Sequence, residues 1–203
     1  MSSGLDRLNG LPPEEARARL LSCCGSSEWA RQMEGARPFR SADDLAAAAD
    51  RIWRSLSKDD WLEAFAAHPK IGSPRVVAGT GPADLHPPQP NAGTGFNLHP
   101  PQPTNLPPPN SDRSRAWSRH EQAGTKGASP ETLANLADAN RDYEERFGHI
   151  FIVCASGRNA GEMLALLESR LHNEPKRELE IAAEEQRKIT RLRLEKLLAT
   201  EGE

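Results

Sequence analysis

The sequence predicts an all-α protein, with one domain built as an irregular helical bundle and a long proline-rich loop inserted into it. Apolar residues recur at three- and four-residue spacing through residues 12–67 and again from about residue 115. Prolines crowd the stretch between them, at residues 73–113. We therefore expect a single domain over residues 1–203, interrupted by this inserted loop.

The first apolar stretch predicts several short helices. Ser41 precedes Ala-Asp-Asp and Ser57 precedes Lys-Asp-Asp. Both serines are expected to be helix N-caps, because a hydroxyl there can accept a hydrogen bond from an otherwise unpaired backbone N–H. The helix after Ser57 should turn its large apolar side chains toward the core, namely Trp61, Leu62 and Phe65.

The proline-rich stretch contains a direct duplication. Leu-His-Pro-Pro-Gln-Pro occurs at residues 85–90 and again at 98–103. Such a sequence cannot sustain a helical hydrogen-bond ladder and buries little apolar surface. We expect an exposed loop, partly in the polyproline-II conformation, in which His86 and His99 carry no chemistry.

After the loop the helical pattern returns. Ser129 and Pro130 fit the N-cap and first position of a helix that runs to about residue 146. The apolar, β-branched run at residues 150–155 is expected to be extended.

Two more helices complete the chain. Asn159 and Glu162 resemble a capping box for a helix through Leu171. Residues 178–198 then predict a long final helix.

Composition narrows the possible partners and the compartment. Lys+Arg 26 against Asp+Glu 29 gives a net charge of −3 without any basic cluster, so nucleic acid is not expected. No run reaches the ~18 apolar residues of a membrane span, and neither a secretory leader nor a peroxisomal Ser-Lys-Leu ending is seen. The three cysteines form no spaced framework, which fits a reducing compartment, and we expect a cytoplasmic protein.

His68 is the first candidate for chemistry. Pro69 disfavours the α conformation at the residue before it, so the preceding helix should stop at His68. An imidazole at a helix C-terminus is expected to be biased toward its protonated form, which suits a proton donor. The alternative interpretation is a histidine that only caps the helix.

Two further candidates come from the second half of the chain. Ser118, Glu121 and Gln122 share one helical face and offer a hydroxyl, a carboxylate and an amide. Alternatively, Ser118 and Glu121 form an N-terminal capping box. Arg193 lies on the apolar stripe of the last helix, so its guanidinium needs an anion, either a substrate or an internal carboxylate.

These motifs, in this order, resemble the 2-oxo-4-hydroxy-4-carboxy-5-ureidoimidazoline (OHCU) decarboxylase family. The resemblance covers nearly the full length except residues 73–113, where the family usually has a shorter connection. It is carried by Trp29, Arg37-Pro-Phe39, His68-Pro69-x-Ile71-Gly72, Ser118-x-x-Glu121-Gln122, Phe147-Gly148, Phe151-Ile-Val-Cys-Ala155 and Lys188-Ile189-x-x-x-Arg193-Leu194.

The resemblance implies an all-helical homodimer without metal or organic cofactor, which decarboxylates the ureidoimidazoline OHCU to (S)-allantoin. Residue by residue, His68 matches the catalytic proton donor, Glu121 a carboxylate that orients the substrate, and Arg193 the substrate-binding arginine. The rest of the implied substrate-binding shell consists of Pro69, Ser118, Gln122 and the backbone of Phe151, Ile152, Val153, Cys154 and Ala155. Unpaired N–H and C=O groups of that extended segment could bind a ureide.

Two other function classes remain open from the residues alone. The chain could be a non-catalytic helical scaffold that presents the duplicated proline motif to a partner. It could also be a metal-dependent hydrolase that uses His68 and Glu121, although no two histidines have the HxxxH ligand spacing on a helix.

Overall fold

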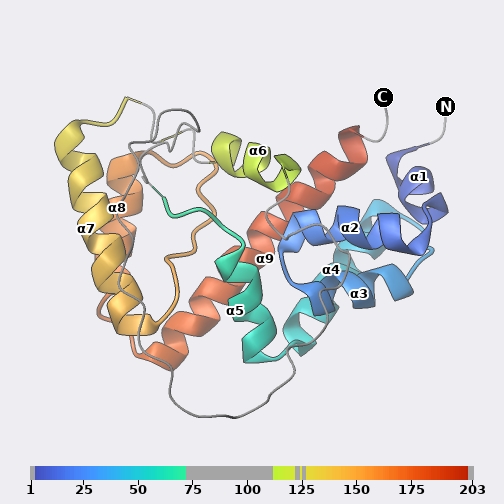
Figure 1. The fold of residues 1–203 in the computed structure, drawn as a ribbon, viewed down its shortest axis with the longest axis horizontal. Helices are drawn as coiled ribbons and strands as arrows, with labels where there is room; N and C mark the ends of the chain where they lie inside the picture. The colour runs from blue at the N-terminus through green and yellow to red at the C-terminus, as the bar shows by residue number, and fades with distance from the viewer. Residues whose placement is uncertain (1–2, 72–111, 122–123, 125–126, 201–203) are drawn as a thin grey trace, which may run out of the picture. The chain divides into compact units, whose positions relative to one another are not determined.

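The computed structural model describes residues 3–71, 112–121, 124 and 127–200, and within these ranges the protein is all-α, as predicted (Figure 1). The helices are α1 (Gly4–Gly10), α2 (Pro13–Cys24), α3 (Ser27–Gly35), α4 (Ala42–Ser55), α5 (Lys58–Ala66), α6 (Asp112–Glu121), α7 (Pro130–Phe147), α8 (Ala160–Arg170) and α9 (Pro175–Thr200). All described residues belong to one compact unit, which joins residues 1–73 to 106–203. The duplicated motif and both of its histidines lie outside the described residues.

The predicted helix starts are confirmed by their caps. The side chains of Ser41, Ser57, Ser129 and Asn159 each accept a hydrogen bond from the backbone N–H three residues on. The Asn159 side chain accepts from the Glu162 N–H at 2.9 Å, and the Glu162 carboxylate accepts a hydrogen bond from the Asn159 backbone N–H. These bonds satisfy N–H groups that would otherwise lack partners in the first turn of each helix.

Helix α9 is the central helix of the larger core cluster. It contacts α1, α2, α4 and α5 on one side and α7 on the other (Figure 1). Trp53 ties α4 to it, because the indole Nε1–H donates to the Ala183 carbonyl at 2.9 Å. As expected, Phe65 is fully buried and Trp61 and Leu62 pack against this cluster. Neither α9 nor any other described helix is long and apolar enough to cross a membrane.

A second core cluster lies between α7, α8 and the extended segment 150–155. Its buried side chains include Leu136, Tyr143, Phe151, Met163 and Leu167. Residues 150–155 form no helix, and the segment runs between the two core clusters: Ile152 belongs to the first and Phe151 and Val153 to the second, as an extended backbone predicts. This alternation follows from the two-residue period of extended chain.

Gly25 joins the end of α2 to the end of α5. It has a φ of 90°, in the left-handed region, and its N–H donates to the Leu21 carbonyl as the C-cap of α2. A Cβ at this position would lie 2.6 Å from the Cβ of Ala67 and 3.3 Å from the Ala64 carbonyl oxygen. The close approach fixes the chain immediately before His68.

Gly25→Ala should therefore lower the free energy of unfolding by about 1–3 kcal/mol, because it combines backbone strain with a steric clash. Urea denaturation followed by circular dichroism would measure the change. Gly35→Ala is the matched control, since a Cβ there meets no atom within 4 Å. Equal stability of the two variants would contradict the proposed constraint at Gly25.

Candidate active site

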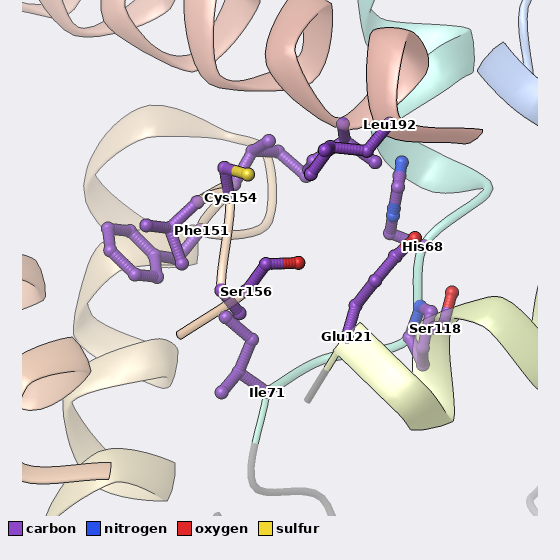
Figure 2. Close-up of a pocket in the computed structure, with 13 residues that line it drawn as sticks. His68, Ile71, Ser118, Glu121, Phe151, Cys154, Ser156 and Leu192 are labelled. Carbon is purple, nitrogen blue, oxygen red and sulfur yellow. The ribbon is translucent and has the colours of Figure 1, made fainter. Parts of the chain in front are cut away.

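His68 is positioned by the end of α5. The helix stops at Ala66 with Ala67 as its C-cap, as the following Pro69 predicts. The His68 backbone N–H donates to the Phe65 carbonyl at 3.0 Å, which closes the last turn. The imidazole then extends into a pocket beneath α9 (Figure 2).

Ser118 and Glu121 come to the same pocket from α6. The helix begins at Asp112, so Ser118 lies in its interior and the capping-box interpretation of Ser118 and Glu121 is wrong. The two side chains are one turn apart on one face, and both are buried. Figure 2 shows Glu121 directed toward His68.

Arg193 holds both of these side chains from α9. Its Nε and Nη2 donate to the two carboxylate oxygens of Glu121 at 3.1 and 2.8 Å, and Nη2 also donates to the Ser118 hydroxyl at 2.9 Å. Arg193 is 2% exposed and Glu121 9%, so the ion pair is buried. Such bidentate pairing fixes both distance and orientation. Of the two partners considered for Arg193, the structure supplies an internal carboxylate.

The pair keeps Glu121 ionised. Burial by itself would raise the pKa of Glu121, but the hydrogen bonds and positive charge of Arg193, with the charge of Lys196, lower it below its usual value. The site therefore contains a carboxylate anion at neutral pH.

The charge state expected for His68 is wrong. Burial, together with the positive charge of Arg193, lowers the pKa of His68 to about 3, and the opposing effect of Glu121 is smaller. The expectation of a protonated ring considered only the local helix C-terminus, whereas burial and a nearby guanidinium both disfavour the imidazolium. The free site therefore contains a neutral imidazole.

Most of the predicted site residues line one pocket that is open to solvent. They are His68, Pro69, Ser118, Glu121, Phe151, Ile152, Val153, Cys154 and Ala155. Arg193 is not among the lining residues and lies behind Glu121 and Ser118. Gln122 lies outside the described residues.

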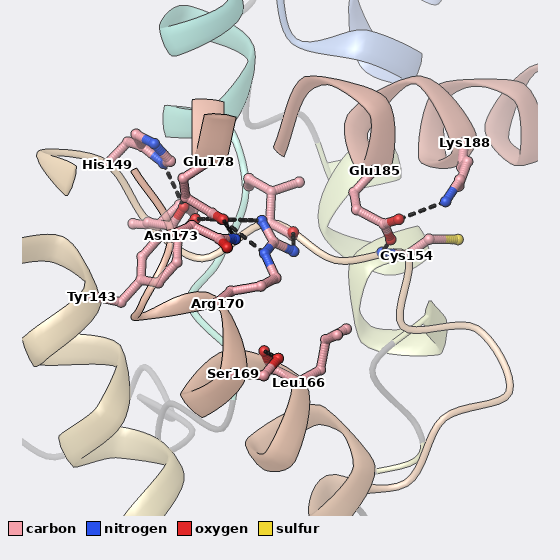
Figure 3. Close-up of polar contacts among 12 residues, drawn as sticks. Tyr143, His149, Cys154, Leu166, Ser169, Arg170, Asn173, Glu178, Glu185 and Lys188 are labelled. Atoms are coloured by element: carbon pink, nitrogen blue, oxygen red, sulfur yellow. Dashed lines mark hydrogen bonds and ion pairs between the residues drawn. The ribbon is translucent and has the colours of Figure 1, made fainter. Parts of the chain in front are cut away.

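The extended segment presents only part of its backbone to the pocket. The Ile152 carbonyl accepts a hydrogen bond from Arg170 at 2.9 Å, and the Cys154 N–H donates to Glu185 at 2.8 Å (Figure 3). Because the N–H and C=O groups of successive residues in an extended chain face opposite edges, the bonds of residues 152 and 154 occupy one edge of the segment. The backbone groups of Val153 lie on the other edge.

A buried charged cluster anchors this segment. Arg170 of α8 donates to Glu178 of α9, and the Tyr143 hydroxyl donates to the same carboxylate (Figure 3). Arg170 is 4% exposed and Glu178 is fully buried. The guanidinium also lies 4.6 Å from the centre of the Phe151 ring. One side chain thus links α8, α9 and the wall of the pocket.

Sequence reasoning missed several residues of the site. Ile71, Ser156, Ile189 and Leu192 complete the pocket wall. Arg170 and Glu185 were not singled out, because their bonds to the backbone of Ile152 and Cys154 join residues far apart in the sequence, which no spacing rule identifies. A charged residue amid the apolar face of the helix ending at Leu171 was the one available signal for Arg170.

Comparison with known proteins identifies the family. The family profile that matches the chain is described as OHCU decarboxylase, and it matches residues 9–106 and 96–195. The chain belongs to the OHCU decarboxylase family. The resemblance drawn from the sequence motifs is thereby confirmed.

Relatives of this chain include the uric acid degradation bifunctional protein TTL of Arabidopsis thaliana. It is 38% identical over 177 residues, which cover 87% of this chain and 45% of that protein. An OHCU decarboxylase of Amia calva is 38% identical over 93 residues, covering 43% of this chain and 53% of that protein. The chain thus spans about half the length of these curated relatives. A crystal structure of OHCU decarboxylase in the presence of (S)-allantoin has a TM-score of 0.64 and 34% identity, covering 90% of this chain and 98% of that one.

Arg170→Met should lower the free energy of unfolding by about 3–5 kcal/mol, because it leaves the Glu178 carboxylate buried without its cation. Chemical denaturation would measure the loss. Arg177→Met is the matched control: Arg177 pairs with Glu180 on the surface, where an ion pair contributes at most about 1 kcal/mol. Similar losses in the two variants would refute the anchoring role of Arg170.

Proposed function

We propose that this protein is a cofactor-independent decarboxylase that converts OHCU to (S)-allantoin and CO2. The observation that carries the proposal is the convergence of His68, Glu121 and the extended segment 151–155 on one pocket, with Arg193 bound to Glu121. Family membership and the (S)-allantoin named with the similar crystal structure support the choice of substrate and product.

The reaction follows from the structure of the substrate. OHCU carries a hydroxyl and a carboxylate on one ring carbon, beside a ring C=N bond. When the C–C bond to the carboxylate breaks, CO2 leaves, the electron pair of that bond forms a C=C bond to the ureido-bearing carbon, and the π pair of the C=N bond moves to nitrogen. The former imine nitrogen takes up one proton from solvent, and the product of this step is an enol. The enol proton then moves from oxygen to the ureido-bearing carbon, which gives allantoin.

The protein contributes orientation, exclusion of water and delivery of that proton to one face. A neutral His68 can accept the enol proton and return it to the neighbouring carbon, which makes it the proton donor of the last step. The ionised Glu121 orients the substrate by accepting a hydrogen bond from its hydroxyl or ureide. Arg193 keeps Glu121 ionised and adds positive charge behind the site, where it can stabilise a substrate oxygen.

The remaining residues of the proposed binding shell would form hydrogen bonds with and pack against the substrate. The Val153 N–H and C=O groups, on the edge of the segment opposite the Arg170 and Glu185 bonds, match the donor and acceptor groups of a ureide. Ser118, Pro69 and Gln122 complete the proposed shell.

Assembly and compartment are further proposals. We propose a homodimer in the cytoplasm, on the strength of the family resemblance, and light scattering would test the dimer against the 22.3 kDa of one chain. The alternative of a proline-motif scaffold rests on residues 85–103, outside the described residues. Within the described part, no three His, Cys, Asp or Glu side chains gather as a metal site.

His68→Asn should lower kcat by roughly 10²- to 10⁴-fold, because the enol then loses its proton carrier. OHCU would be generated in situ from urate, and the allantoin followed by circular dichroism. We expect slow formation of racemic product instead of the (S) enantiomer. His172→Asn, the same substitution at an exposed histidine, should behave as wild type. A His68→Asn variant with full rate and stereoselectivity would eliminate the proposal.

Arg193→Lys should raise the pKa of Glu121, because a lysine keeps the charge but loses the two-pronged contact. Since only the ionised carboxylate orients the substrate, kcat/KM should begin to fall at a higher pH than in wild type as the solution is acidified. A pH profile of kcat/KM would measure this shift. Arg191→Lys, in the neighbouring pair with Asp50, is the control and should leave the profile unchanged. Identical profiles for all three proteins would count against the assigned role.

A further inference from the structure

We propose that Gln186 of α9 is a positioning residue that fixes which ring nitrogen of His68 carries the proton. The proposal rests on the proposed function only for its catalytic consequence. Gln186 is fully buried, one turn of α9 before Thr190, and its amide has two distinct ends to satisfy.

The orientation of the Gln186 amide follows from its neighbours. Its Nε2 donates to the Cys24 carbonyl at 3.1 Å and to the Thr190 hydroxyl oxygen at 3.3 Å. The Thr190 hydroxyl in turn donates its own proton to the backbone carbonyl of Gln186 at 3.0 Å. Both neighbours therefore act as acceptors toward the amide, so the NH2 end must face them and Oε1 must face away.

Two complementary buried atoms remain. Gln186 Oε1 and His68 Nε2 are both enclosed, and neither has a hydrogen-bond partner among the residues that the structure describes. Leaving a buried acceptor and a buried donor unpaired would cost about 1–3 kcal/mol each. A proton on Nε2, donated to Oε1, satisfies both atoms at once.

The electrostatics of the ring agree with this pairing. Although burial dominates and lowers the pKa of His68, the nearby side-chain amide of Gln186 acts in the opposite direction. Gln186 is therefore close enough to interact with the imidazole.

The catalytic consequence concerns Nδ1. In a neutral imidazole only one nitrogen carries a proton, so a proton on Nε2 leaves the lone pair on Nδ1. Because Nε2 is enclosed, Nδ1 is the nitrogen left for a bound substrate. The ring would then meet the substrate as a proton acceptor, ready to take the enol proton before it returns that proton to carbon.

The tautomer can be measured directly in the wild-type protein. Long-range ¹H–¹⁵N NMR of the histidine-labelled full chain at pH 7 distinguishes the two neutral forms, and the His68 signals are those lost in His68→Asn. We expect the proton on Nε2. A proton on Nδ1, or the averaged signals of fast exchange, would overturn the proposal. The measurement involves no turnover, so its outcome is independent of whether the chain decarboxylates OHCU.

Substitutions then test the role of Gln186. Gln186→Met removes the amide and should mix the tautomers and lower kcat by roughly tenfold, with KM nearly unchanged. Gln186→Glu keeps an acceptor oxygen beside Nε2 and should keep a proton on that nitrogen, although it loses the donor to the Cys24 carbonyl. Thr190→Val is the matched packing control, because it removes a contact from the NH2 end only. Wild-type tautomer and kcat in Gln186→Met would refute the proposal; if that variant does not fold, the wild-type and Gln186→Glu spectra still decide.

Discussion

The buried ion pair between Arg193 and Glu121 is the interaction on which the site depends. It joins α6 to α9 across 72 positions of sequence, and it reaches the Ser118 hydroxyl at the same time. The same guanidinium lowers the pKa of both neighbouring titratable groups, His68 and Glu121. Burial and this positive charge together keep the imidazole neutral, and the same charge keeps the carboxylate ionised against the effect of burial.

A second arginine has a comparable task in the pocket wall. In the part of the chain that the structure describes, the segment 150–155 belongs to no helix or sheet, so side chains satisfy part of its backbone. Arg170 provides a donor for one carbonyl and Glu185 an acceptor for one N–H. Because Arg170 is itself paired with Glu178, the wall is connected to the core rather than to solvent. The two buried arginines therefore have different roles. Arg193 influences the charge states of His68 and Glu121, whereas Arg170 holds the backbone of the pocket wall.

The sequence predicted what is local and failed where distant groups decide. The caps at Ser41, Ser57 and Asn159 were predictable because each bond spans three residues. The start of α6 was not, because Ser118 and Glu121 fit an N-terminal capping box as well as one face of a helix that begins earlier, at Asp112. The pKa of His68 was predicted in the wrong direction, since the helix terminus is visible in sequence but the burial of the ring and its proximity to Arg193, 125 positions away, are not. The motifs that carried the family resemblance identified the pocket residues without indicating these contacts.

The bonds along the extended segment have a consequence for handedness. Ile152 and Cys154 are tied to the protein on one edge, so a ligand can pair only with the opposite edge. A flat enol held along one border has a single face toward His68 and the other toward the apolar wall. In the proposed reaction, the main chain that Arg170 and Glu185 hold in place would then determine the configuration of the new stereocentre. The imidazole would protonate whichever face of the enol is turned toward it.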